Sequence, residues 1–267
     1  MAQNIVPTTM PGALPGPFEA LAGLRNTALD TATYDTARLT GEERRVLSRG
    51  TGAPGSILVV GPKGAGGIRR FATHGALRAA PGPVLTQIAV AGMGASETGA
   101  AALARTLADV TGRPAGAVVA GYTREDALVE ALGGGVLFAA AQRARQAVGT
   151  LRRRLVEMAV ETAAPGRRAA LGPDSFAVPA VATLARLMAD RDRRLDLVVG
   201  HARGALLLSA AFALLARTAP AEAVARAARA QVVTAGAAVA FPEPVQWVHQ
   251  VIGALDPLGR LNAEDGV

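Results

Sequence analysis

The stretch that decides the fold is LDLVVGHARGALLLSAA, residues 195–211. Its apolar first part predicts a buried strand that ends near Gly200, and its second part predicts an apolar helix. Between them lies the short turn GHARG, residues 200–204. Glycine at both ends of a tight strand-to-helix turn is expected where the neighbouring strand and helix leave no room for a side chain. The stretch therefore predicts a strand, a sharp turn and a helix packed closely together.

The same alternation of strand and helix continues along most of the chain. Apolar strands are predicted at 56–61, 82–92, 115–122, 195–200, 230–241 and 245–257, and helices at 96–112, 123–134, 174–192 and 202–217. Strands that alternate with helices predict an α/β fold, a doubly wound and mostly parallel sheet with helices on both faces. The nearly continuous apolar strands agree with burial on both sides of the sheet.

Two segments differ from this pattern. Residues 1–50 are predicted to form an N-terminal arm, with a helical turn capped by Thr40, on an α/β domain that spans 51–267. Residues 137–168 are predicted to form an Arg-rich amphipathic helix inserted in that domain. A solvated helix face explains these arginines, and contact with a membrane or polymer surface is the alternative.

The composition excludes several kinds of site. Half of the 267 residues are apolar but only 3% are aromatic, so the core is built mainly from Ala, Val and Leu. The chain has no cysteine, which excludes disulfides, thiolate metal sites and cysteine nucleophiles. It shows no secretory leader and no apolar run long enough for a transmembrane segment, so we expect a cytoplasmic protein.

The net charge of +7 comes almost entirely from arginine, because Lys63 is the only lysine among 28 basic residues. Such an excess attracts nucleic acids and other anionic partners. The chain lacks the aromatic residues that nucleic-acid binders interleave with their arginines, so the sequence argues against nucleic acid as a partner. No cluster of side chains has the spacing of metal ligands, and the glycine-rich residues 61–67 lack the spacing of a phosphate loop. No metal and no cofactor is predicted.

The GHARG turn resembles the G-x-S-x-G nucleophile elbow of the α/β-hydrolase superfamily. DPLGRL, residues 256–261, is similar to the acid-bearing D-x-x-x-R-L loop of the lipase class 3 branch, and IAVAGMGAS, residues 88–96, to its oxyanion loop. The resemblance covers residues 56–262. It implies roles for the elbow glycines Gly200 and Gly204, for His201 in local packing, for Ala202 at the nucleophile position, for Asp256 at the acid position, and for Met93 and Arg203 as oxyanion-type donors.

The chain departs from this family at two catalytic positions. Ala202 has no hydroxyl, so no acyl-enzyme can form there. In the family the catalytic histidine follows the acid after one more strand, but residues 257–267 contain no histidine and leave no room for that last strand. The chain's histidines are His74, His201 and His249, and we expect structural roles for all three.

Three functions are compatible with these residues. The first is a catalytically inactive α/β-hydrolase-like protein that acts as a binding or interaction subunit. The second is a Ser→Ala, and also truncated, form of an esterase, lipase or thioesterase. The third is a basic module that binds an anionic polymer or surface.

The strand at 245–257 would end the sheet if the last family strand is absent. It is apolar, carries Trp247 and has no lysine, and exposed edges of this kind are normally covered. We therefore expect a protein partner, or a second copy of the chain, at the sheet edge near Trp247. Coverage by residues 1–50 is the alternative. An acyl or ester ligand at the elbow is a further expectation.

Overall fold

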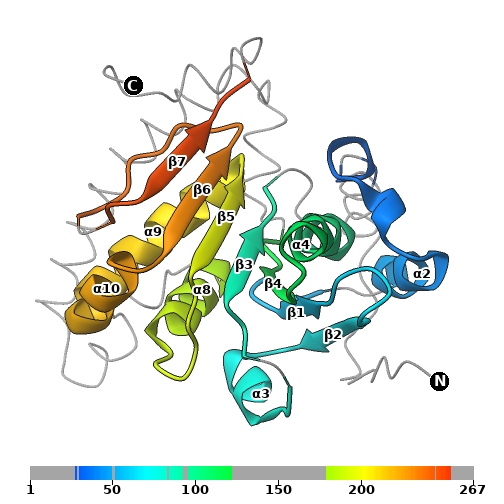
Figure 1. Cartoon of the computed structure of the whole chain (residues 1–267), viewed down its shortest axis with the longest axis horizontal. Helices are drawn as coiled ribbons and strands as arrows, with labels where there is room; N and C mark the ends of the chain where they lie inside the picture. The colour runs from blue at the N-terminus through cyan, green and yellow to red at the C-terminus, as the bar shows by residue number, and fades with distance from the viewer. Residues whose placement is uncertain are drawn as a thin grey trace, which may run out of the picture. The chain divides into compact units, whose positions relative to one another are not determined.

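A computed structural model describes residues 28, 30–49, 52–82, 84–92, 96–121, 179–243 and 245–253 of the chain. Its strands are β1 Ile57–Val60, β2 Ile68–Phe71, β3 Gln87–Val90, β4 Ala115–Val118, β5 Leu197–His201, β6 Gln231–Ala235 and β7 Val248–Val251. They form one sheet in the order β2-β1-β4-β3-β5-β6-β7 (Figure 1). Strands β3 to β7 are parallel, whereas β1 is antiparallel to both β2 and β4. The predicted α/β class with a mostly parallel sheet is confirmed at this level.

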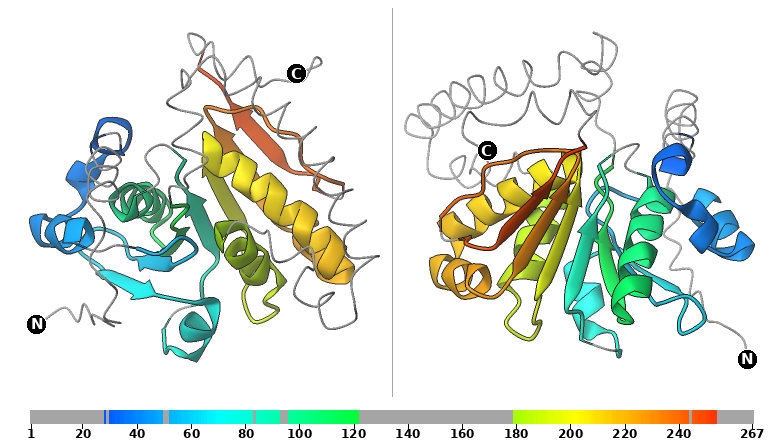
Figure 2. Two further views of the ribbon diagram at one scale, coloured as in Figure 1. Left: turned by 180° about the vertical axis from the view of Figure 1, so that it is seen from behind. Right: turned by 45° about the horizontal axis from the view of Figure 1, so that its top comes forward.

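The helical segments are η1 Thr36–Arg38, α2 Gly41–Arg49, α3 His74–Ala79, α4 Glu97–Thr111, α8 Pro179–Ala189, α9 Arg203–Thr218 and α10 Pro220–Ala227. Helix α4 packs on β1, β3 and β4 together with η1 and α2, while α8, α9 and α10 pack on one another and cover the opposite face (Figure 2). Within the described ranges, none of these helices has the length and apolarity that crossing a bilayer would need. Strands β1, β3 and β4 are buried at every position, as the apolar pattern predicts for strands covered on both faces, whereas alternate residues of β5 and β6 and every residue of β7 are half-exposed or exposed.

Four elements were not predicted from the sequence, the three-residue η1 among them. Strand β2, IRRF, has two half-buried arginines at its centre and so lacks an apolar run. Helix α3 has only six residues, too few to show helical periodicity. Helix α9 ends at Thr218, but a further helix, α10, begins directly at Pro220, which lies in its first turn, where a missing N–H costs nothing. The helix predicted at 123–134 and the Arg-rich insertion at 137–168 lie outside the described residues.

Capping side chains set the helix ends that the sequence predicted. Thr40 and Glu43 form a capping box, since the Glu43 N–H donates to Thr40 Oγ1 at 3.1 Å and the Thr40 N–H donates to Glu43 Oε2 at 2.8 Å. Ser96 caps α4 by accepting from the Gly99 N–H, and Gly112 ends this helix with φ 68°.

The described part of the N-terminal arm is built into the core. Tyr34, Leu39 and Leu47 are buried with β1, β4 and the alanine-rich face of α4. The small side chains of α4 let the helix approach the sheet closely, and Arg105 on α4 forms a fully buried ion pair with Glu43 on α2 at 2.6 Å. Packing of this kind fixes the arm against α4 and brings Tyr34 to the edge where β3 and β5 end.

Candidate functional site

The turn between β5 and α9 has a strained backbone at Ala202. Its φ is 49° and its ψ is −120°, and it is the only non-glycine residue with positive φ in the described ranges. L-residues other than glycine rarely adopt this backbone conformation, which costs about 1–3 kcal/mol. Two backbone hydrogen bonds hold it: the Ala202 N–H donates to Ala235 O at 2.8 Å, and the Ala205 N–H donates to Ala202 O at 3.0 Å. The turn thus presents residue 202 in a fixed orientation at the carboxyl end of β5.

Close backbone contacts explain the two glycines of the turn. A Cβ on Gly204 would overlap the carbonyl oxygen of Val90 on β3, and one on Gly200 would lie 2.7 Å from the Cα of Ala205. Gly92, just after β3, faces the turn from the other side, and a Cβ there would overlap His201 O. The strained turn, which follows β5, therefore packs directly against the backbone at the end of β3. The contribution of Gly92 was missed, because only the fold brings residues 92 and 201 together.

A tyrosine from the arm joins the two sides of this turn. The Gly92 N–H donates to the Tyr34 hydroxyl at 3.0 Å, and that hydroxyl lies 2.9 Å from His201 Nδ1, with the two rings edge to face at 5.3 Å. The Tyr34 hydroxyl therefore bonds to a backbone N–H after β3 and to a ring nitrogen of His201 at the end of β5. This supports the predicted packing and hydrogen-bonding role of His201. Nothing in the sequence pointed to Tyr34, since it lies 167 positions from its partner.

The structure places only part of the predicted catalytic set. The half-buried Arg203 is the first residue of α9, and its Nη1 donates to Gly121 O at 3.2 Å. Met93 and Asp256, the predicted second oxyanion donor and acid, lie outside the described residues. Residues 200–204 form the turn between β5 and α9, and the roles assigned to them stay predictions.

The other two histidines lie away from the turn. His74 begins α3, at the end of the sheet where the parallel strands start, whereas Ala202 follows the end of β5 (Figure 1). His249 is exposed on β7, and the register pairs it through Val233 with Val199. Two strand spacings of about 4.8 Å therefore separate it from β5. Neither imidazole is placed to take a proton from a side chain at position 202.

Buried acids lie at the start of α4, at the same end of the sheet as the turn. Asp30 is fully buried and its Oδ2 accepts from the Ser96 N–H at 2.8 Å, next to the helix N-terminus. Glu97 binds Arg70 through two hydrogen bonds of 2.7 and 2.6 Å. Burial raises the pKa of Glu97 above its ordinary value, although the Arg70 guanidinium opposes this. These contacts anchor the start of α4 and do not reach the turn.

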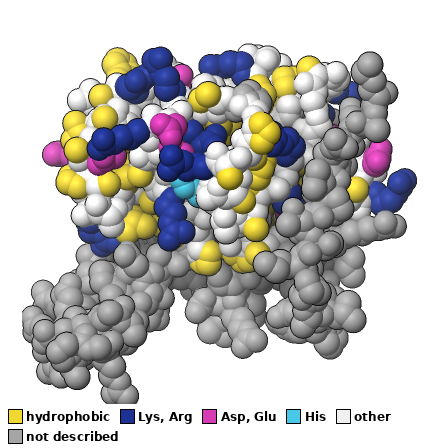
Figure 3. Space-filling view, turned by 90° about the horizontal axis from the view of Figure 1, so that it is seen from below, with side chains coloured by type: hydrophobic (Ala, Val, Ile, Leu, Met, Phe, Trp, Pro, Cys, Tyr) yellow, Lys and Arg dark blue, Asp and Glu magenta, His cyan; other side chains and the backbone are white. Residues whose placement is uncertain are grey.

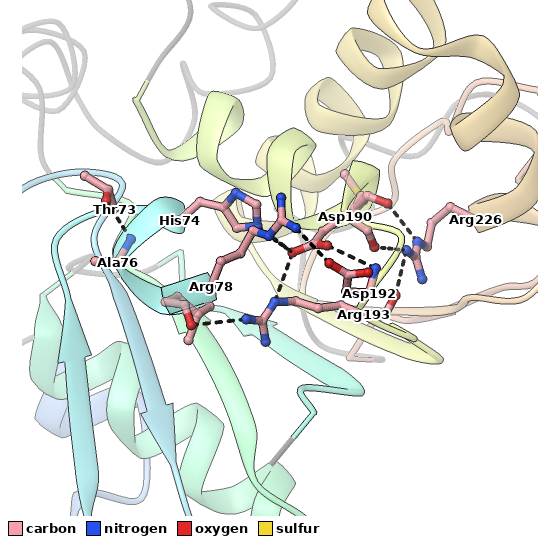
Figure 4. A network of polar contacts seen from close by, with 10 residues as sticks. Thr73, His74, Ala76, Arg78, Asp190, Asp192, Arg193 and Arg226 are labelled. Atoms are coloured by element: carbon pink, nitrogen blue, oxygen red, sulfur yellow. Dashed lines mark hydrogen bonds and ion pairs between the residues drawn. The ribbon is translucent and has the colours of Figure 1, made fainter. Parts of the chain in front are cut away.

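A second polar cluster lies at the opposite end of the sheet, where the parallel strands begin (Figure 4). The buried Asp190 Oδ2 lies 2.9 Å from His74 Nε2 and 3.2 Å from Arg193 Nε, so this carboxylate joins α3 to the turn between α8 and β5. From the other side, Arg226 of α10 donates to the backbone oxygens of Met188, Asp190 and Arg193. This arginine satisfies carbonyls at the C-terminal end of α8, which explains why its charge is buried.

The polar partners of Asp190 determine its ionisation. Burial alone would raise its pKa, but the hydrogen bonds from His74 and the Asp192 N–H, with the charges of His74 and Arg78, bring the pKa below the ordinary 3.8. Within the described residues, no group of three or more His, Asp or Glu side chains is arranged to hold a metal ion. The chain has no significant match among models of protein families, curated proteins or solved structures.

Proposed function

We propose that this chain is a non-catalytic α/β-hydrolase-like protein that binds a ligand at the carboxyl ends of its strands, beside the turn at residues 200–204, and a partner at the edge strand β7. The observation that carries the proposal is the backbone of Ala202, with φ 49° and ψ −120°. A strained strand-to-helix turn is the device by which hydrolases expose a nucleophile. Here the strain is present but the side chain is a methyl group.

The position of the turn in the sheet supports a binding role. The chain runs from β3 through α4 to β4 on one side of β3, whereas from β5, on the other side of β3, it runs through α9 and α10 to β6, farther away. The helices that follow β3 and β5, α4 and α9, accordingly lie on opposite faces of the sheet (Figure 2). In open α/β sheets, ligands bind at the carboxyl ends of strands where the winding direction changes. Ala202 and Gly92 lie at this point.

The side chains near the turn argue against acyl transfer. No hydroxyl is present at position 202, and Tyr34 occupies Nδ1 of the adjacent His201. His74 is hydrogen-bonded to Asp190 at the far edge of the sheet. Among the described residues, none of these side chains is placed to act as a general base for a nucleophile at position 202.

An ester-hydrolysis assay with a fluorophosphonate probe tests the proposal. We expect no saturable hydrolysis and no covalent labelling from the protein as it stands or from Ala202→Ser, because a hydroxyl alone gains no base. The parallel variant Ala211→Ser, within α9, controls for a serine added elsewhere. If Ala202→Ser alone becomes a labelled, saturable esterase, the chain is a Ser→Ala form of an active hydrolase and the non-catalytic proposal is wrong.

For the partner, we infer a second copy of this chain at strand β7. This strand ends the described sheet, Val248–Val251 contains no Lys, Arg, Asp or Glu, and Trp247 and Val251 are 56% and 59% exposed. An uncharged edge can pair with its own copy across a two-fold axis, which is the commonest symmetry of homodimers.

A further inference from the structure

A hollow of about 180 Å³ lies beside the Asp190 cluster, at the end of the sheet where the parallel strands begin. Three arginines from three elements line it, Arg69 of β2, Arg78 of α3 and Arg193 of the turn before β5, so they outnumber the two acids in the wall, Asp190 and Asp192. Apolar side chains, including Val59, Leu77 and Leu85, form much of the remaining wall. Figure 3 shows this edge, where arginine side chains surround acidic side chains and a histidine.

Two of these arginines are held in place by acids. Arg193 Nε lies 3.2 Å from Asp190 Oδ2 and its Nη2 donates to Leu77 O at 3.2 Å. Arg78 Nη2 donates to Asp192 Oδ2 at 2.7 Å. Each guanidinium retains one NH₂ group that these contacts do not use, because a guanidinium carries five N–H donors.

Arg69 differs from the other two. It faces Val59 across the β1–β2 pair, and its guanidinium carbon lies 5.1 Å from the ring centroid of Phe71. Its Nη1 lies 2.5 Å from where a Cβ on Gly82 would stand, so glycine there leaves room for the guanidinium. Among the residues that the structure describes, the side chain of Arg69 makes no hydrogen bond and no ion pair. The half-buried Arg69 guanidinium, stacked on the Phe71 ring, thus has all five of its N–H donors without a hydrogen-bond partner among the described residues.

We propose that this hollow binds the phosphoryl group of a small ligand, with Arg69 as the principal anchor. A planar guanidinium binds phosphate through two parallel N–H···O bonds, and the remaining donors of Arg78 and Arg193 can reach other oxygens of a tetrahedral group. A carboxylate, with two oxygens in one plane, would leave part of this donor set unsatisfied. The hollow is small compared with pockets for drug-sized molecules, which selects a compact ligand. The site is independent of the elbow.

Titration of the full chain with inorganic phosphate, followed by calorimetry and ³¹P NMR at low ionic strength, tests this inference. We expect saturable binding with one site per chain, and loss of affinity by at least about tenfold in Arg69→Gln. Arg69→Lys retains the charge but not the fork, so it should also bind more weakly than the parent. Arg186→Gln, which removes an exposed arginine on α8 outside the hollow, should leave the affinity unchanged.

Several results would overturn the inference. No saturable phosphate binding by the parent protein would show that the hollow takes no such ligand. An equal loss in Arg69→Gln and Arg186→Gln would show that net charge alone attracts the anion. Displacement of phosphate by acetate at equal concentration would assign the hollow to carboxylates. Thermal melting of each variant verifies that it is folded, so that a loss of binding reports on the site.

Discussion

At the scale of single residues, Ala202 combines a backbone conformation of high energy with a side chain that does no chemistry. Gly200, Gly204 and Gly92 each leave space that backbone atoms of a neighbouring segment occupy. The Tyr34 hydroxyl forms hydrogen bonds with both the Gly92 N–H and His201 Nδ1. The turn is therefore defined by close packing, and its geometry does not depend on a catalytic hydroxyl.

The strain at Ala202 predicts that Ala202→Gly stabilises the protein. Glycine adopts φ 49° and ψ −120° without a steric penalty, which removes about 1–3 kcal/mol of strain. The greater freedom of glycine in the unfolded chain opposes this by about 0.5–1 kcal/mol. We expect a net gain of about 1 kcal/mol in the free energy of unfolding, measured by urea denaturation.

The matched control is Ala211→Gly in the middle of α9, where the same change should destabilise by about 1 kcal/mol because glycine lowers helix propensity. If Ala202→Gly loses stability as Ala211→Gly does, the turn is not strained and the elbow proposal loses its main support.

At the scale of secondary structure elements, the polar cluster around Asp190 decides how α3, α8 and α10 meet. His74 comes from α3, Arg193 from the turn before β5 and Arg226 from α10 (Figure 4). One buried carboxylate and the carbonyls beside it therefore connect segments that are far apart in the sequence.

This cluster predicts a specific pH dependence. The pKa of Asp190 is below 3.8 in the folded protein, so its stabilising contribution is present above 3.8 and is lost as the pH falls through the folded pKa. Asp190→Asn should lower the free energy of unfolding by about 1–3 kcal/mol at neutral pH, since it weakens hydrogen bonds to charged partners. The difference between parent and variant should shrink as the pH falls below 3.8, measured by denaturation at several pH values.

Asp192→Asn is the control, because it removes the same charge from a side chain that is 75% exposed. It should change stability by no more than about 0.5 kcal/mol. A parent–variant difference at Asp190 that stays constant at all acidic pH values would contradict the assigned ionisation.

At the scale of the whole molecule, the two edges of the described sheet differ in character. Strand β2 carries Arg69 and Arg70 at its centre, whereas β7 has no Lys, Arg, Asp or Glu. Charged side chains discourage an edge strand from pairing with another chain, so β7 is the edge suited to association.

We therefore predict that the protein dimerises through β7 and that Val251→Lys reduces this association. A lysine on the edge adds two like charges across the two-fold axis and must lose hydration when the strands pair. Sedimentation velocity over a range of protein concentrations measures the effect, with an expected weakening of about tenfold or more.

Val110→Lys, at a side chain on α4 that is 78% exposed, should leave the association unchanged. A parent protein that is monomeric at every concentration would eliminate the edge interface. Dimers that persist unchanged in Val251→Lys would show that they form through another surface.

The sequence by itself determined the α/β class, because apolar strands and capped helices are local patterns. The helix-end residues Thr40, Ser96 and Gly112 were readable for the same reason, since each acts within a few residues. The GHARG turn was also readable, because its glycines stand at fixed spacing between a strand and a helix. Strand β2 and helix α3 were not, since one carries arginines where apolar residues were expected and the other is too short to show a period.

Only the tertiary structure decided which distant residues meet. It brings Tyr34 and Gly92 to His201, and it leaves Arg69 in a hollow without a carboxylate partner among the described residues. The direction of β1, antiparallel to both neighbours, likewise depends on sheet pairing and not on its own four residues. Contacts of this kind join chain segments up to 167 positions apart. No local pattern encodes them, because packing and hydrogen bonding select partners in space and not along the chain.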